Sequence, residues 1–346
     1  RGVRGVLGGF LAGSGDAGDR RVGTVVVRRG PGAAITGARY ALDVFLEVFV
    51  YSTLWMSFSL ASLVLFVQLR CAATAAATSA PAASAVVGLG ALDWRPFWAG
   101  FSESVAVYTL DHMRDLGKAQ RLALADPAGS KSALESGSRR LGLRLRLAIL
   151  RVFHIASLIG FFASLIFSHS WRVRATFLGH VLLGIGYSKL KPRMPYLKAA
   201  YVSLCVTFMA VAAPAAYRPG MLSVLGLPEV FRVCLLTFVL AHTVEHLQDL
   251  RDVDDDGEAG VKTVPSGLGQ DRARQLLLAV QAVGLVLHMG VGLTTGLPFR
   301  PEMVFAYLLA GTFGALFSPR TPRVLFQVAL EPLYVAPLAG LLLGPR

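Results

Sequence analysis

The sequence has few charged residues and few cysteines for a chain of 346 residues. Charged residues make up 16% of it and only 21 are acidic, whereas 54% of the residues are apolar. A soluble enzyme of ordinary composition and a disordered chain both carry more charge, so this balance excludes both. The three cysteines lie far apart, which excludes a disulfide framework and a zinc knuckle and favours packing roles for Cys71, Cys205 and Cys234.

The apolar residues gather in long runs with few charges inside them, and the mean hydropathy is +0.57. Because a helix needs about 20 apolar residues to cross a bilayer, the runs predict a polytopic membrane protein of the all-α class. We expect nine transmembrane helices, or eight if the second run, around Ser102 to Tyr108, is only partly inserted. The predicted spans lie near residues 41–67, 97–111, 145–167, 173–189, 197–217, 230–250, 274–295, 302–318 and 324–344.

The chain is basic, with a formal net charge of +13. Its Lys and Arg residues stand in short segments between apolar runs and not along an aromatic face, so we expect no nucleic-acid partner. Nine spans place most of the 34 Lys and Arg residues on the side that holds the N-terminus. The positive-inside tendency predicts that this side is cytosolic, or stromal or matrix in an organelle.

Two segments look unlike the apolar runs. Residues 1–40 are basic and begin with Arg, so we expect a fragment or a processed form whose start is a flexible N-terminal segment or a targeting remnant, followed by a transmembrane domain over 41–346. The Ala-rich stretch from Cys71 to Ala85 contains Pro81 and is predicted to be an irregular connection on the less basic side.

Acidic residues crowd the end of the sixth span, where seven fall between Glu245 and Glu258. On a helix that turns about 100° per residue, four of them lie within roughly 60° of one another, with His242 close to the same face. The four are Glu245, Asp249, Asp252 and Asp256.

A second pair of acids, Asp111 and Asp115, ends the second span with i, i+4 spacing, and Tyr108 lies one turn earlier. The predicted topology puts both clusters on the basic side. A carboxylate at the bilayer centre costs about 2.5–3.5 kcal/mol, so water and cations must reach these groups. Mg²⁺ is usually held by one or two carboxylates together with substrate phosphates, so facing acidic clusters predict Mg²⁺ and a phosphate-bearing ligand.

Basic residues that suit such a ligand follow the fourth span and the second acidic cluster. Together with a metal they could neutralise a leaving diphosphate. Taken singly, the acids could belong to a solvated loop or a helix end, and the basic residues could serve only to set the membrane orientation. Because both kinds lie at the ends of even-numbered spans, a common binding site is favoured. The bases are Lys189, Lys191, Arg193, Lys198 and Lys262.

Three segments resemble motifs of the UbiA superfamily of intramembrane prenyltransferases. The run from Leu247 to Pro265, LQDLRDVDDDGEAGVKTVP, is similar to the second aspartate-rich motif of that family. The run from Gly186 to Arg193, GYSKLKPR, followed by Lys198, is similar to the segment after the fourth helix, and Tyr108 to Asp115 falls where the first aspartate motif belongs.

The resemblance implies a bundle of nine transmembrane helices around a central lipid-open cavity, with membrane lipid as its surroundings. It further implies that Mg²⁺ bridges the two acidic clusters and a prenyl diphosphate, which ionises to an allylic cation that a lipophilic acceptor, aromatic or other, captures. The implied metal ligands and catalytic residues are Asp111, Asp115, Asp249, Asp252 and Asp256. The implied substrate-binding residues are Tyr108, Tyr187, Lys189, Lys191, Arg193, Lys198 and Lys262.

The first motif departs from the family pattern, because Val107 and Tyr108 stand where the common form has Asn and Asp. The loop that follows lacks the Asn-Lys-Pro-x-Arg-Pro run of some members and keeps only Asp126-Pro127. A Mg²⁺-dependent prenyltransferase is the preferred function. A terpene cyclase of the same superfamily and a non-catalytic isoprenoid-binding paralogue stay open as alternatives.

A zinc peptidase is a further alternative, since the run from His242 to His246 fits H-x-x-E-H. The aspartate run that follows has no role in a peptidase, so we expect these two histidines to pack or hydrogen-bond inside the bundle.

Overall fold

The computed structural model describes residues 54–79, 92–125, 133–190, 194, 196–253, 256, 262–321 and 323–343. They all belong to one compact unit, Val44–Arg346. The predicted boundary between residues 40 and 41, and the whole predicted N-terminal segment, lie outside the described residues.

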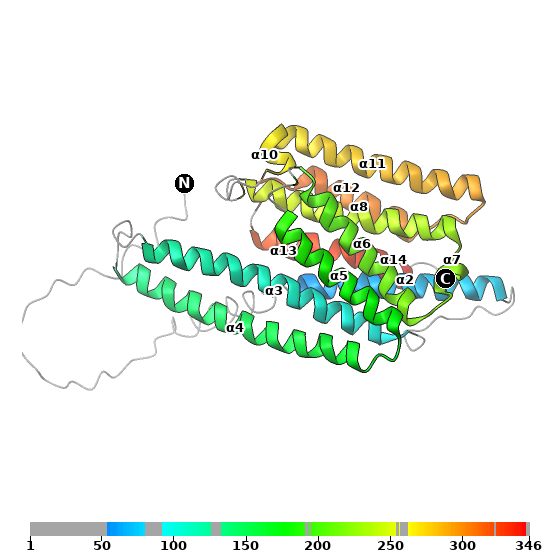
Figure 1. Cartoon of the computed structure of the whole chain (residues 1–346). Coiled ribbons are helices and arrows are strands. Elements are labelled where there is room, and N and C mark those ends of the chain that lie inside the picture. The colour runs from blue at the N-terminus through cyan, green and yellow to red at the C-terminus, as the bar shows by residue number, and fades with distance from the viewer. Residues whose placement is uncertain are drawn as a thin grey trace, which may run out of the picture. The chain divides into compact units, whose positions relative to one another are not determined.

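Every regular element among the described residues is a helix, which confirms the predicted all-α class. The long helices lie side by side in a bundle (Figure 1). They are α2 (Leu54–Ser79), α3 (Trp94–Ala125), α4 (Ala133–Ile166), α5 (Trp171–Leu190), α6 (Lys198–Tyr217), α8 (Leu227–Arg251), α11 (Gln270–Thr295) and α12 (Pro301–Leu316). Shorter elements are α7 (Met221–Leu225), α10 (Val264–Leu268), α13 (Arg323–Leu330), the 3₁₀ helix η4 (Glu331–Tyr334) and α14 (Ala336–Leu343).

Helix α8 is the centre of the packing, with α6, α11, α12 and η4 against it. Its ends follow from local chemistry: a proline lies in the first turn, where no backbone donor is lost, and Glu229 and Arg251 complement the helix dipole at the two ends. Apolar side chains on several sides of α8 are buried, including Leu236, Val239 and Ala241. A helix buried around its circumference in this way holds its two ends in fixed positions.

Eight of the nine predicted spans each overlap a long helix, and the last overlaps the short elements α13, η4 and α14 together. Five helical stretches of the described residues are long and apolar enough to cross a membrane, so the chain is a membrane protein. The count of nine stays a prediction. The five stretches are Leu54–Ala76, Leu147–Ile166, Lys198–Tyr217, Leu227–Arg251 and Gln270–Thr295.

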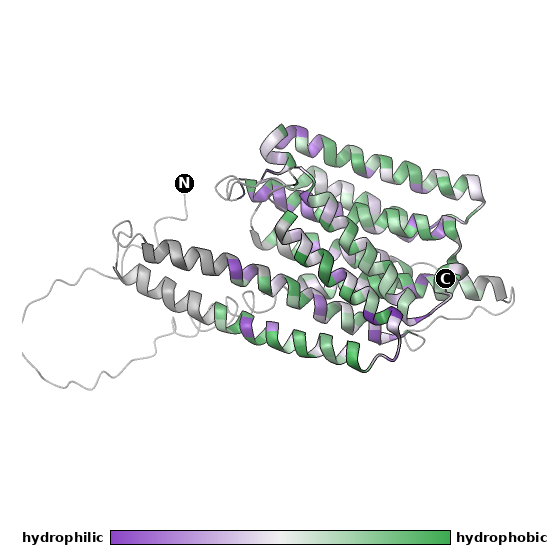
Figure 2. Ribbon diagram, viewed as in Figure 1, coloured by the Kyte–Doolittle hydropathy of each residue, from purple (hydrophilic) through white to green (hydrophobic). Residues whose placement is uncertain are grey.

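Large apolar side chains on the outer helices face away from the core. Ile155, Phe162, Leu182 and Val286 are each more than half exposed, and hydrophobic residues occupy long stretches of the helices of the bundle (Figure 2). In water such a surface would be costly, whereas hydrocarbon accommodates it, so the pattern agrees with a bundle in lipid.

Three helices extend beyond the stretches predicted from the apolar runs. The Ala-rich stretch after Cys71 is not irregular at its start, because α2 continues to Ser79; alanine has the highest helix propensity, and this outweighed the polar character of the stretch. Helix α3 continues past the predicted end at residue 111 to Ala125, and α4 begins at Ala133. These two helices pair with each other, so helical structure extends beyond their apolar runs.

Candidate active site

Two of the predicted acids share one lysine. Asp249, in the last turn of α8, is only 2% exposed and forms an ion pair with Lys198, the first residue of α6. The Nζ atom of Lys198 also lies 3.3 Å from Oδ2 of Asp256, which is buried as well. A cation therefore lies between two buried carboxylates where the sequence predicts an ion.

Helix packing explains this arrangement. Helices α6 and α8 are neighbours, and the start of α6 lies beside the end of α8. A lysine at a helix N-terminus is unfavourable against the helix dipole, and the two carboxylates offset that cost. The carboxylates in turn need a positive neighbour, because like charges in a partly dehydrated site repel each other.

Asp252 has a different partner from its two neighbours. It follows the last residue of α8, and its Oδ1 atom accepts a hydrogen bond of 2.6 Å from Nε of Arg251. The Arg251 guanidinium also lies 5.6 Å from the centre of the Phe326 ring. The predicted shared face thus brings Asp249 and Asp256 together on Lys198, while the Asp252 side chain, 34% exposed, pairs with Arg251.

The first aspartate motif lies on α3. Tyr108 packs against the main apolar core and lies within electrostatic range of Glu245, one turn before Asp249 on α8. Asp111 is i+3 from Tyr108, so the helix carries it one turn further along a similar face. The side chains of Asp111 and Asp115 lie outside the described part of the chain.

The predicted substrate-binding residues are described only in part. The Tyr187 ring stacks on Tyr201 at 5.6 Å, and Tyr187 lies within electrostatic range of Tyr108. Lys262 is exposed, and its carbonyl accepts a hydrogen bond of 3.1 Å from the amide of Tyr196. Lys191 and Arg193, and the side chain of Lys189, lie outside the described residues.

The sequence analysis missed a buried acid, Glu331. It opens η4, where the last predicted span breaks into two short helices, and it is 3% exposed. Glu331 and Tyr334 lie within electrostatic range of Tyr108, and Tyr334 is also within range of Glu245. The available signal was a glutamate followed by a proline inside an apolar run, which is costly in a membrane without a function or a partner.

The two histidines of the H-x-x-E-H run lie inside the bundle. Nε2 of His246 donates a hydrogen bond of 2.9 Å to the carbonyl of Ala273 on α11, and the His242 ring stacks on Phe238. Within the described ranges, no group of three or more His, Cys, Asp or Glu side chains is placed to hold a metal ion. The contacts of His246 support the packing interpretation.

The end of α8 that carries Asp249 and Asp256, called the acid end below, nevertheless has ligands that suit Mg²⁺. Asp249 and Asp256 present carboxylate oxygens to one cation, and Mg²⁺ prefers such hard oxygen ligands and needs only one or two carboxylates when phosphate supplies the rest. The residues therefore fit a site in which Lys198 or a divalent ion balances the same two charges.

The opposite end of α8 carries a second group of buried charges. Glu229 accepts hydrogen bonds from Arg70, at 2.8 Å, and from Arg232, at 3.1 Å, and Arg300 lies 3.5 Å away. Arg70 also reaches Glu302 at 3.5 Å, which links α2, α8 and α12. Arg70 and Arg232 are at most 2% exposed, so these buried ion pairs hold helices together.

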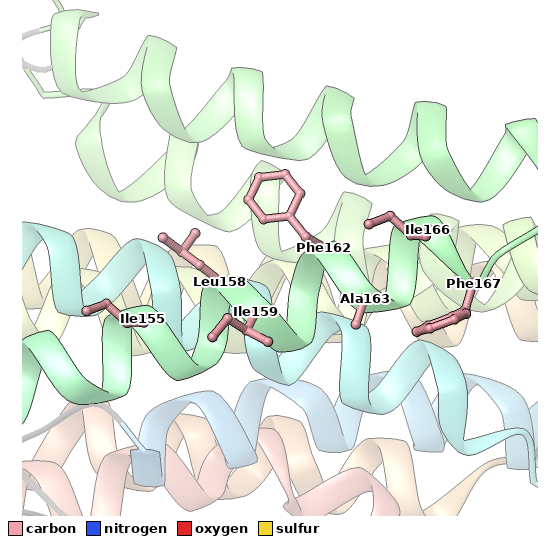
Figure 3. Close-up of a pocket in the computed structure, with 7 residues that line it drawn as sticks. All are labelled: Ile155, Leu158, Ile159, Phe162, Ala163, Ile166 and Phe167. Carbon is pink, nitrogen blue, oxygen red and sulfur yellow. The ribbon is translucent and has the colours of Figure 1, made fainter.

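An apolar depression of about 420 Å³ lies on α4, away from both charged groups (Figure 3). All seven of its lining side chains are apolar, from Ile155 to Phe167. It has no polar group to bind a diphosphate, and its position on an outer helix suits a lipid chain.

A sequence model of the UbiA prenyltransferase family matches residues 143–326, more than half of the chain. The chain belongs to the UbiA prenyltransferase family. The match includes the motif segments at Gly186 and Leu247 and excludes the divergent segment from Tyr108 to Asp115. The resemblance drawn from the motifs is thus confirmed.

Solved structures agree with the family assignment at the level of fold. A UbiA homologue from Archaeoglobus fulgidus bound to GPP and Mg²⁺ is 15% identical, with a TM-score of 0.52 over 86% of this chain and 98% of that chain. The same homologue bound to DMAPP and Mg²⁺ is 16% identical, with a TM-score of 0.50 and the same coverage. A comparison with curated proteins finds no significant match.

Proposed function

We propose that this UbiA family member is a Mg²⁺-dependent intramembrane prenyltransferase, which transfers a polyprenyl group from a prenyl diphosphate to a lipophilic acceptor. One observation carries the proposal: Asp249 and Asp256 are buried around a single cation at the end of a central helix. Structures of the same fold with GPP or DMAPP and Mg²⁺ support the choice of ligand.

The proposed metal ligands are Asp249, Asp252 and Asp256 on the α8 side and Asp111 and Asp115 on the α3 side. When bound, Mg²⁺ would supply positive charge to the diphosphate as its bond to the prenyl carbon breaks. To reach a metal, Asp252 would have to give up its ion pair with Arg251. That ion pair is weak enough to exchange, because the Asp252 side chain is 34% exposed.

Lys198 has two proposed tasks. It neutralises Asp249 and Asp256 before a metal binds, which keeps two buried carboxylates from repelling each other. With the two carboxylates engaged by a divalent ion, the Lys198 ammonium would be available to the phosphate oxygens. Lys189, Lys191, Arg193 and Lys262 would hold the same diphosphate from the segments that follow α5 and α8.

Aromatic and apolar side chains would handle the prenyl part of the substrate. Tyr108 and Tyr187 lie within electrostatic range of each other on α3 and α5, and aromatic faces attract a nearby cation by up to about 2 kcal/mol when water is excluded. The buried core around them keeps water from capturing the allylic cation. The active-site side would be the basic side, cytosolic or stromal or matrix.

The first experiment measures diphosphate release by the purified protein in lipid nanodiscs with geranylgeranyl diphosphate. We expect release with Mg²⁺ and none with chelator, and loss of release in Asp249→Asn. The matched control is Asp271→Asn, because Asp271 is an exposed acid on α11 that takes no part in the site. Equal release by wild type and Asp249→Asn would refute the proposal.

The same assay separates the alternatives. A cyclase would release diphosphate and form a cyclic hydrocarbon or alcohol without any acceptor. The non-catalytic paralogue, which Tyr108 at an Asp position favours, would bind the substrate without releasing diphosphate. A zinc peptidase would be indifferent to Mg²⁺ and active with Zn²⁺.

A further inference from the structure

A second pair of ionisable side chains lies deeper in the bundle than the acid end. Nδ1 of His180 on α5 lies 2.7 Å from Oε1 of Glu103 on α3. Glu103 is eight residues before Asp111, so the pair lies about 12 Å further along the helix axis. Both residues are inside predicted spans, where ionisable groups are expensive and usually serve a function.

The hydrogen bond fixes the chemistry of the imidazole. The carboxylate of Glu103 accepts a hydrogen bond from Nδ1–H of His180, which leaves the lone pair of the neutral ring on Nε2. A carboxylate that holds a histidine in this tautomer makes Nε2 a proton acceptor and stabilises the imidazolium that forms. Nε2 makes no hydrogen bond with any residue that the structure describes.

Burial distinguishes the two partners. The Glu103 side chain is 1% exposed, and its Oε2 atom has no hydrogen-bond partner among the described residues. The His180 side chain is 16% exposed. The carboxylate is therefore closed in behind the imidazole, and the imidazole is the part that another molecule can reach.

The surroundings connect the pair to the proposed site. His180, Gly184 and Tyr187 share one face of α5, and a Cβ on Gly184 would lie 3.9 Å from Val107 of α3. On α6 the matching face carries Phe208, which stacks on His180, and Tyr201, which stacks on Tyr187. The Glu103–His180 pair and the two tyrosines, Tyr187 and Tyr201, thus lie in a row between α3, α5 and α6.

We propose that the Glu103–His180 pair is the proton-accepting site for a hydroxylated acceptor in the prenyl transfer proposed above. The bond between the prenyl carbon and the diphosphate oxygen breaks, and its electron pair leaves with diphosphate. The acceptor oxygen forms the new bond to that carbon, and the hydroxyl proton moves to Nε2 of His180. Glu103 then faces an imidazolium.

This inference rests on the proposed prenyl transfer, so the test measures the two half-reactions separately. Protein in nanodiscs receives geranyl diphosphate, Mg²⁺ and a panel of phenols and naphthols or their O-methyl ethers. Diphosphate release reports ionisation, and the prenylated product reports transfer. Wild type should transfer to hydroxylated probes and not to the ethers.

In His180→Gln and Glu103→Gln we expect transfer to fall about 10²–10⁴-fold, the usual contribution of a general base. Diphosphate release should change by less than about tenfold, because Asp111, one of the aspartates proposed to drive it, lies about two turns away along α3. Free imidazole should restore part of the transfer in His180→Gly. If the pair only held helices together, its loss would not lower transfer far more than diphosphate release, and imidazole would not restore transfer.

The matched control is His154→Gln. His154 is another histidine packed on α3, where Nδ1 donates a hydrogen bond of 3.0 Å to the carbonyl of Ala106 from the α4 side. Its ratio of transfer to release should equal that of wild type. Equal loss of release and transfer in the Glu103 and His180 variants would overturn the inference, as would retained transfer.

Two further outcomes are informative. Release of diphosphate by wild type without transfer to any hydroxylated probe would refute the assigned acceptor class. Absence of release from wild type would refute the proposed function itself, which keeps the two failures apart.

Discussion

The two ends of α8 both carry buried charges, but they are built differently. At the Glu229 end two glutamates are bound by three arginines, Arg70, Arg232 and Arg300. At the Asp249 end, about 30 Å away along the helix, one lysine serves two aspartates, and Glu245 is buried nearby. The first end already holds enough positive charge, whereas the second has carboxylates in excess, so only the second can accept a further cation without a large cost.

The comparison predicts that the largest effect on chemistry comes from the Asp249 end. Asp249→Asn keeps the size of the side chain but removes a charge that the metal needs, so diphosphate release should fall on the order of 10³-fold, equivalent to several kcal/mol. The folded protein should survive, because Lys198 keeps Asp256 as a partner. Diphosphate release and a thermal unfolding curve in detergent, measured on the same sample, check both statements.

The largest effect on stability should come from the Glu229 end. Arg232→Met leaves Glu229 short of one buried partner, and breaking a buried ion pair costs about 3–5 kcal/mol. Activity per folded molecule should be unchanged, because this end is remote from the acids. Reversible unfolding in denaturing detergent measures the loss, with the exposed Arg172→Met as the control that should change little. A stable Arg232→Met protein with reduced turnover would contradict the assignment of the Glu229 end to stability and of the Asp249 end to catalysis.

An intermediate effect is expected from removing the lysine that occupies the acid end. In Lys198→Gln the two aspartates lose their positive neighbour, which at 4 Å is worth about 1–4 kcal/mol between water and a protein surface. We expect Mg²⁺ to bind about tenfold more tightly than to wild type, and to raise the melting temperature more. A Mg²⁺ titration of thermal stability tests this, with Arg272→Gln, an exposed change on α11, as the control. Unchanged or weaker Mg²⁺ binding would show that Lys198 does not compete with the metal.

The smallest effect concerns how tightly two glycines are packed, Gly340 beside Glu302 and Gly267 beside Tyr196. A Cβ on Gly340 would lie 2.9 Å from Cβ and 3.1 Å from Cα of Glu302, and backbone cannot move aside. A Cβ on Gly267 would meet the ring of Tyr196, a side chain that is 47% exposed and so has room to shift. Gly340→Ala should therefore cost about 1–3 kcal/mol and Gly267→Ala clearly less. Equal losses of unfolding free energy in Gly340→Ala and Gly267→Ala would mean that the two places are equally rigid. Denaturation of both variants in detergent measures these losses.

The sequence predicted those features that depend on neighbours along the chain. Apolar runs located the helices, and i, i+3 and i+4 spacing located the acids of α8, two of which do share a partner. Asp252 was expected to join them but bonds its own neighbour Arg251, a contact that the spacing of the acids does not predict.

The remaining features depend on contacts between helices far apart in sequence. Arg70 meets Glu229 across 159 positions, and Glu103 meets His180 across 77, and neither pair has a local signal. Glu331 sits where a span breaks into a 3₁₀ turn, which hydropathy alone does not reveal. Alanine propensity extended α2 beyond its predicted end.

The most direct test of the account is the position of a divalent ion in crystals grown with Mn²⁺ in place of Mg²⁺ and a non-hydrolysable geranyl thiolodiphosphate. Anomalous scattering locates Mn²⁺ independently of the protein density. We predict Mn²⁺ within bonding distance of Asp249, between α8 and the Asp111 segment of α3, with Lys198 displaced from at least one aspartate. Mn²⁺ absent from that place, or bound instead beside Glu229 and Glu302, would contradict the account.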